Sequence, residues 1–218
     1  MIIAVDGPAG AGKGTISEYL AMKFDLLYLD TGLLYRALAK AVITQKVDPA
    51  NAVAVANIAH TIQVKDVDDH ELRGEEIAAI ASQVAVLNEV RDILSDLQRN
   101  FCRSVTAPYK GAILDGRDIG TVICPDADCK LFITARPEIR NQRRLLETQI
   151  RSDASSEVVS SISQKIIERD RRDSTRKIAP LTPAPDAIII DTSDLTIDEA
   201  CSKAALYVEK RLLQSKDI

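Results

Sequence analysis

A glycine-rich loop near the N-terminus has the residue types and the spacing of a phosphate-binding loop. It follows the apolar run Met1 to Val5 and precedes a stretch in which Ile16 and Leu20 repeat at helical spacing. In such a loop the backbone N–H groups turn toward an anion, the helix N-terminus adds its positive end, and Lys13 reaches the outer phosphates. A turn that binds nothing is the alternative, but strand and helix supply the context that the motif requires. The loop consists of Gly7, Pro8, Ala9, Gly10, Ala11, Gly12, Lys13, Gly14 and Thr15.

The residue after Lys13 bears on metal binding. Loops of this kind commonly carry a Ser or Thr at that place, and its hydroxyl binds the Mg²⁺ that accompanies a nucleoside triphosphate. Here the place is taken by Gly14, and the hydroxyl comes one residue later, at Thr15. We expect Mg²⁺ to enter with the nucleotide, and whether Thr15 contacts it directly or through water stays open.

Arginines form a second set of groups that could act on phosphates. Between Arg136 and Lys177 the chain has eleven Lys or Arg and seven acids, a local charge of +4 in a chain of net charge −4. A basic island in an acidic protein indicates a small polyanion bound at one place, since a duplex-binding protein is usually basic over a whole face. A solvated helix with salt bridges is the alternative. Arg36 and Arg117, which follow predicted strands, would supply a second anion site.

Short apolar runs predict the strands that position these groups. Four of the five runs are followed directly by an aspartate, and ligands bind at the carboxyl ends of parallel strands in open α/β sheets. Helical patterns lie between the runs, including a C-terminal one whose entry, Thr196 to Glu199, is a capping box. We therefore predict an α/β protein with a P-loop three-layer fold and a five-stranded parallel sheet. The runs are Met1 to Val5, Leu26 to Leu29, Ala112 to Leu114, Leu131 to Ile133 and Ala187 to Ile190, and the aspartates are Asp6, Asp30, Asp115 and Asp191.

Two stretches exceed what such a core needs. Residues 41–104 separate two strands by far more than a crossover requires and read mainly helical, which predicts an inserted subdomain. Residues 145–173 are polar, serine-rich and then strongly charged, and with few apolar residues to anchor them we predict a mobile lid. The core would then consist of residues 1–40, 105–144 and 174–218.

Composition limits the environment of the protein. Hydrophobic residues make up 46% and charged residues 28%, and no run approaches the roughly 18 apolar residues of a membrane span. The first apolar run is too short for a signal-peptide core, so we expect a cytoplasmic protein without a membrane or nucleic-acid partner. We expect it to be a monomer. Because the cysteines are scattered without the spacing of a zinc site, we expect reduced core thiols at Cys102, Cys124, Cys129 and Cys201.

Several motifs resemble those of a known family. The Gly-Lys-Gly-Thr ending of the loop resembles the nucleoside monophosphate kinases, and two further motifs, Leu29 to Arg36 and Asp115 to Thr121, are similar to those of bacterial cytidylate kinases. The resemblance covers nearly the whole chain. It implies reversible, ATP-dependent phosphorylation of CMP and dCMP to CDP and dCDP with Mg²⁺ as cofactor, and it makes residues 41–104 the acceptor-binding insert. It extends through Leu72 to Glu76, Ala81 to Ala85 with Arg91, Glu168 to Asp173 and Arg176 to Leu181.

The resemblance also implies a role for each site residue. Residues 7–15 would hold the ATP phosphates, and the CMP site would consist of Asp30, Arg36, Ser82, Arg91, Arg117, Asp118, Arg169, Asp173 and Arg176. Lys13, Arg117 and Arg176 would be catalytic. Asp118 also has a chemical rationale, because a carboxylate accepts a hydrogen bond from the amino group of cytosine but meets a lone pair on uracil.

Other functions are also open at this stage. A kinase of the same architecture could act on UMP, AMP or a small metabolite. A nucleotide-dependent switch would need a group that positions water, commonly an acid near the end of a strand. Here Asp115 is followed by Gly116 and Arg117, which do not supply such a group. A nucleic-acid-binding module is disfavoured by the acidic net charge of the chain.

Overall fold

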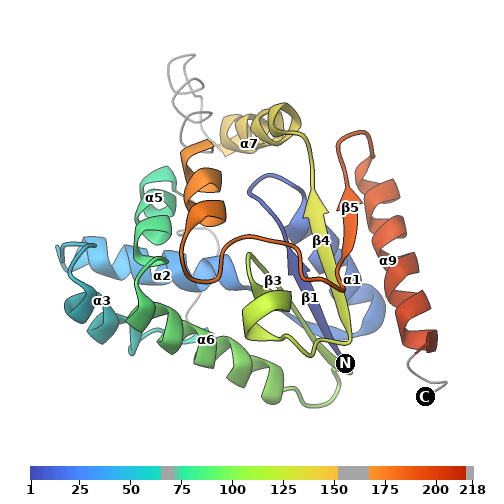
Figure 1. The fold of residues 1–218 in the computed structure, drawn as a ribbon, viewed down its shortest axis with the longest axis horizontal. Helices are drawn as coiled ribbons and strands as arrows, with labels where there is room; N and C mark the ends of the chain where they lie inside the picture. The colour runs from blue at the N-terminus through green and yellow to red at the C-terminus, as the bar shows by residue number, and fades with distance from the viewer. Residues whose placement is uncertain (65–71, 73, 152–166, 215–218) are drawn as a thin grey trace.

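A five-stranded parallel sheet forms the centre of the protein in the computed structural model, which describes residues 1–64, 72, 74–151 and 167–214 (Figure 1). The strand order is β2-β3-β1-β4-β5, and all neighbouring strands are parallel. This confirms the predicted fold class. The strands are β1 (Ile2–Asp6), β2 (Leu26–Asp30), β3 (Gly111–Gly116), β4 (Cys129–Thr134) and β5 (Ile188–Asp191), one for each predicted run.

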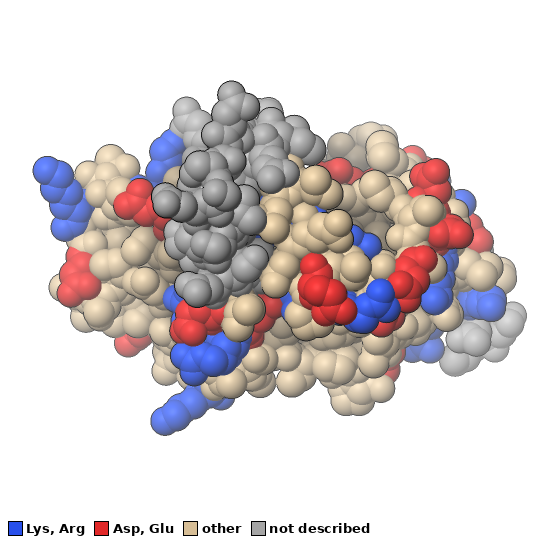
Figure 2. Space-filling view, turned by 90° about the horizontal axis from the view of Figure 1, so that it is seen from above, with Lys and Arg blue, Asp and Glu red and all other residues tan. Residues whose placement is uncertain are grey.

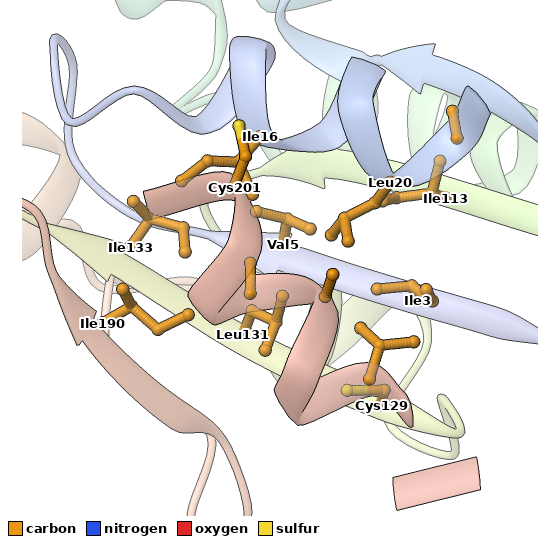
Figure 3. Packing of buried hydrophobic residues seen from close by; sticks show 14 of the residues in the cluster. Ile3, Val5, Ile16, Leu20, Ile113, Cys129, Leu131, Ile133, Ile190 and Cys201 are labelled. Atoms are coloured by element: carbon orange, nitrogen blue, oxygen red, sulfur yellow. The ribbon is translucent and has the colours of Figure 1, made fainter. Parts of the chain in front are cut away.

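Helices cover both faces of the sheet (Figure 1). On one face α1 (Lys13–Phe24) and α9 (Ile197–Gln214) pack over Ile3 and Val5 of the central strand (Figure 3). Ala4, which points the other way, belongs to a separate core with α6 (Asn88–Arg103) and a turn of π-helix, η2 (Ile119–Ile123). Because both faces are covered, the strands are apolar throughout rather than alternating.

A third, smaller core lies among the helices between β2 and β3. It is formed by α2 (Thr31–Thr44), α3 (Ala52–Ala59), α5 (Glu75–Val84) and the first half of α6. α6 belongs to this core and to the core that contains Ala4. Its Val90 and Leu94 pack among the helices, and its Phe101 packs against the sheet. The helix therefore couples the residues of the predicted insert to the sheet.

Two helical segments lie beyond the carboxyl end of β4. They are α7 (Pro137–Arg151), which follows β4, and the helix of residues 167–175, which is drawn in orange beside α5 in Figure 1. Residues 152–166, the middle of the predicted lid, and residues 65–71 of the predicted insert lie outside the described residues.

The entry to α9 has the predicted capping box. The Thr196 N–H donates to Glu199 Oε2 at 2.8 Å, and the Glu199 N–H donates to Thr196 Oγ1 at 3.2 Å. The two residues therefore satisfy two of the free N–H groups at the helix start. In the part of the chain that the structure describes, no helix has the length and apolar character needed to cross a membrane.

Candidate active site

The glycine-rich loop connects β1 to α1 and carries its own lysine. Gly7 passes so close to β4 that a Cβ there would lie 1.9 Å from the carbonyl oxygen of Ile133. Gly12 precedes α1 with a φ of 91°, a left-handed conformation that glycine adopts readily. Lys13 begins the helix, and its Nζ donates to the carbonyl oxygen of Pro8 at 3.1 Å. The loop is thus shaped by glycine where other residues would collide or be strained.

A cleft of about 290 Å³ opens beside this loop, at the carboxyl ends of β2 and β3. Six residues of the predicted ATP-binding loop line it, namely Ala9, Gly10, Gly12, Lys13, Gly14 and Thr15. Gly7 and Pro8 are not in its wall, and Ala11 is fully buried beneath it. The rest of the lining consists of Glu18, Tyr28, Asp30, Gly32, Leu33, Arg36, Asp115, Gly116, Arg117, Arg144 and Arg169.

Burial changes the acid–base properties of the cleft. Together with the nearby Arg117 it lowers the pKa of Lys13 to about 8. It raises the pKa of Asp115 to about 7, in part because Asp30 is close. Tyr28 donates its hydroxyl to Asp115 Oδ2 at 2.7 Å. A bound polyphosphate would favour the charged form of Lys13, so the cleft suits an anion.

A smaller pocket of about 50 Å³ adjoins the cleft. Gly32, Gly116, Arg117 and Arg169 line both, so the two spaces share a wall. Seven of the nine residues predicted for the CMP site meet in this pocket, and Asp30 and Arg36 line the cleft instead. The seven are Ser82, Arg91, Arg117, Asp118, Arg169, Asp173 and Arg176.

Two buried carboxylates organise the pocket, and each pairs with two guanidinium groups. Asp118 is 7% exposed, pairs with Arg91, and accepts from Arg176 Nη2 at 3.2 Å. Asp173 accepts from Arg117 Nε at 2.9 Å and lies 4.0 Å from Arg169 Nε. Burial opposes the ionisation of Asp173, yet Arg117 and Arg169 hold its pKa below the ordinary value.

Two polar atoms of the pocket lack a hydrogen-bond partner among the described residues. They are Ser82 Oγ and Arg169 Nε, both buried. Buried polar atoms are normally paired, so such atoms in a pocket wall suit the polar groups of a ligand.

A third pocket, of about 270 Å³ and mainly apolar, lies on the far side of the loop. Gly10, Gly12 and Thr15 separate it from the cleft, since they line both. Arg143 of α7 donates to Thr192 Oγ1 at 2.9 Å and to the Thr192 carbonyl oxygen at 2.7 Å. The apolar wall consists of Ala11, Ile16, Leu146, Leu195, Ile197 and Ala200. A flat apolar ring next to a phosphate group would suit this space.

Two acids that were not predicted as site residues, the buried Asp6 and the partly buried Asp170, hold the loops in place. Asp6 accepts from the N–H groups of Ile119 and Gly120, at 2.7 and 2.8 Å, and so fixes η2 behind Asp118. Burial raises the pKa of Asp6 to about 6. Asp170 pairs with Arg140 and accepts from the N–H of Ala9 at 3.4 Å. A sequence signal exists for Asp6, which directly follows the apolar run Met1 to Val5 and ends β1, but none identifies Asp170 among its charged neighbours.

Comparison with known proteins gives the family. Residues 3–210 match the cytidylate kinase family. The chain belongs to this family. A cytidylate kinase of Methylocella silvestris is 48% identical over 208 residues, which are 95% of this chain and 93% of that protein. One from Cereibacter sphaeroides is 48% identical and covers 99% of this chain and 98% of its own, and one from Rhodopseudomonas palustris is 44% identical with 96% of each covered. The family that the motifs resemble is thus confirmed.

Similarity to solved structures is more distant. An uncharacterized protein from Eubacterium ventriosum superimposes with a TM-score of 0.48 and 15% identity, over 96% of this chain and 98% of that chain. The family assignment therefore rests on the sequence relatives.

Proposed function

We propose that the protein transfers the γ-phosphoryl group of ATP to CMP or dCMP, forming ADP and CDP or dCDP in a reversible reaction. Its membership of the cytidylate kinase family supports this. The observation in the structure that supports it most is the shared wall of the phosphate cleft and the acceptor pocket, formed by Arg117 and Arg169. Phosphoryl transfer needs donor and acceptor aligned side by side with positive charge between them.

The donor would lie along the glycine-rich loop. The backbone N–H groups of the loop and the Lys13 ammonium would bind the β- and γ-phosphates in the cleft. The adenine ring would then enter the apolar pocket between α7 and α9, because the two spaces meet at Gly10, Gly12 and Thr15. Leu146 and Ile197 would pack against the ring.

The residues of the cleft fit a magnesium ion that is bound mainly by phosphates. Within residues 1–64, 72, 74–151 and 167–214, no three His, Cys, Asp or Glu side chains gather to hold a metal by themselves. Mg²⁺ typically keeps several waters and takes one or two protein oxygens beside substrate phosphates. Asp115, which faces Gly14 across the cleft, and the Thr15 hydroxyl would supply them. The ion would neutralise charge between the two nucleotides.

The acceptor would occupy the smaller pocket. Arg36, Arg117 and Arg176 would hold its phosphate, and one oxygen of that phosphate attacks the γ-phosphorus of ATP while ADP leaves. The same guanidinium groups, with Lys13, would stabilise the charge that spreads over the transferring oxygens. Asp173 and Arg169 would face the sugar, with Asp30 at the edge of the site. This uses both anion sites that the sequence predicts.

The cytosine ring would be read by Asp118, Arg91 and Ser82. An ionised carboxylate has about four lone-pair sites, so Asp118 can accept from an amino group of the base while it still binds Arg91. The amino group of cytosine supplies that donor, and the carbonyl of uracil does not. The unpaired Ser82 Oγ would complete the contacts to the base. This arrangement favours cytidine over uridine.

Residues 41–104 and 145–173 would act as the acceptor-binding insert and the lid. The first range carries Ser82 and Arg91, and the second carries Arg169 and Asp173, so both contribute to one pocket. That the protein is a monomer stays a prediction. Figure 2 shows Lys and Arg interspersed with Asp and Glu on the visible face.

A panel of nucleoside monophosphates tests this proposal. ADP release from ATP is followed by a coupled assay with CMP, dCMP, UMP, AMP or GMP as acceptor. We expect CMP and dCMP to be used best and Lys13→Met to abolish turnover of both. Equal rates with AMP and CMP, or ADP release that does not depend on any acceptor, would contradict it.

A further inference from the structure

Two cysteines outside the proposed site lie side by side. Cys102 is in the last turn of α6, and Cys124 directly follows η2, with their Sγ atoms 3.7 Å apart. Cys102 is half-buried and Cys124 is buried, whereas Cys129 and Cys201 lie in the core on the other face of the sheet. All four are free thiols. The sequence predicts four equivalent core thiols, but the structure makes two of them a pair.

An arginine lies next to this pair. Arg99, one turn before Cys102, donates from Nε to the Ile123 carbonyl oxygen at 3.3 Å and from Nη2 to the Val122 carbonyl oxygen at 3.1 Å. These bonds hold the guanidinium beside Cys124. The hydrogen bond with Cys102 lowers the pKa of the Cys124 thiol, burial opposes this shift, and the charge of Arg99 adds to it, whereas the same hydrogen bond and burial raise the pKa of Cys102. A thiolate is the form of cysteine that reacts with oxidants, and nearby cations increase its population.

We propose that Cys102 and Cys124 are a peroxide-reactive pair that closes to a reversible disulfide. The Cys124 thiolate attacks a hydroperoxide, the O–O bond breaks, and the products are a sulfenic acid at Cys124 and an alcohol, or water when the oxidant is hydrogen peroxide. The Cys102 sulfur then attacks the Cys124 sulfur, the S–O bond breaks, and the hydroxyl leaves as water with the proton of the Cys102 thiol. Two thiols are oxidised by two electrons in total, and one peroxide is reduced.

The geometry makes the second step feasible. A disulfide bond is about 2.05 Å long, so the two sulfur atoms must approach by about 1.6 Å from their present 3.7 Å. The bond would tie the end of α6 to the end of η2. Arg91 is on the same helix, and Asp118 directly precedes η2, so the bond would fasten the two elements that position this ion pair. It would also restrict the conformations of the unfolded chain and so raise the melting temperature of the protein.

Oxidation of the folded, full-length chain tests the proposal without reference to its activity. The protein is treated with a small molar excess of hydrogen peroxide, remaining thiols are alkylated, and digested peptides are analysed by mass spectrometry. We expect a linked peptide containing Cys102 and Cys124, alkylated Cys129 and Cys201, and a melting temperature that rises by several degrees and returns after treatment with a thiol reductant.

Single variants make the test specific. Cys102→Ser should leave a sulfenic acid at Cys124 that a dione probe traps, and Cys129→Ser, the matched control, should form the same linked peptide as the unaltered chain. Circular dichroism shows whether each variant is folded. If a variant is not folded, the peptide analysis of the unaltered chain decides whether Cys102 and Cys124 form the disulfide. Absence of the linked peptide, or equal oxidation of all four cysteines, would overturn the proposal.

Discussion

Replacing Asp118 by Asn removes the carboxylate that binds two buried arginines in the acceptor pocket. Arg91 is 4% exposed and Asp118 is 7% exposed, so the change leaves guanidinium charges in a poorly solvated place. It also changes what the base meets, because an amide can donate a hydrogen bond to the carbonyl of uracil where the carboxylate cannot. We therefore expect one effect on stability and a separate one on the choice of substrate.

The magnitude of each effect follows from these contacts. Removing one partner of a buried ion pair costs about 3–5 kcal/mol. The lower end, about 3 kcal/mol, applies here because Arg91 keeps its bond to the Ala85 carbonyl oxygen and Arg176 keeps one to Ala179. In a chain of this size that lowers the melting temperature by roughly 6–12 °C. A hydrogen bond that reads a base is worth about 1–3 kcal/mol, so the ratio of kcat/KM for CMP to that for UMP should fall roughly 10- to 100-fold.

The assay compares kcat/KM for CMP and for UMP in both proteins, at a temperature where both are folded. Asp96→Asn is the matched control, since Asp96 is an exposed carboxylate that pairs with Arg99 at 3.1 Å, and it should leave the ratio unchanged. If Asp118→Asn lowers kcat/KM for both acceptors by the same factor, the carboxylate has only a structural role and the assignment of base recognition is wrong.

Further predictions concern the phosphate groups and pH. Arg176→Ala should lower kcat with CMP by roughly 10³-fold or more, measured at saturating ATP, because it removes a guanidinium from the transferring phosphoryl group. Burial lowers the pKa of Lys13 to about 8, so kcat/KM for ATP should fall as pH rises through 8, and calorimetry in two buffers at pH 8 should detect proton uptake on ATP binding. Burial raises the pKa of Asp6 to about 6 from an ordinary 3.8, so the folded state binds the proton of Asp6 more tightly than the unfolded state. The stability that this proton contributes is complete below pH 4 and is lost as the pH rises through 6. Melting curves of the unaltered chain should therefore lose stability between pH 4 and 7 relative to Asp6→Asn, and parallel curves would contradict this.

The strands and the glycine-rich loop could be predicted because their signals are local. Each strand is a short apolar run, since both faces of the sheet are covered, and four runs end in an aspartate that reaches the ligand-binding edge. The capping box of α9 is equally local. These features depend on residues a few positions apart, so a single sequence is sufficient.

The contacts that complete the site join residues far apart in the chain. The N–H of Ala9 donates to Asp170, 161 residues away, and Tyr28 donates to Asp115, 87 residues away. No spacing rule relates such pairs, and Asp170 stands among charged residues that look alike in the sequence. The family resemblance places Arg91 and Asp118 around the same base, but no local pattern predicts that they pair. The pair forms because α6 runs from the helical core to the sheet and so brings Arg91 to Asp118.

Transfer of label from ATP to CMP tests the proposed reaction most directly. ATP labelled in the γ-phosphoryl group is incubated with the protein, Mg²⁺ and CMP, and the products are separated by chromatography. We predict that the label appears in CDP in the same molar amount as ADP, and that Lys13→Met forms neither. Label recovered as inorganic phosphate, at a rate that CMP does not change, would contradict the account.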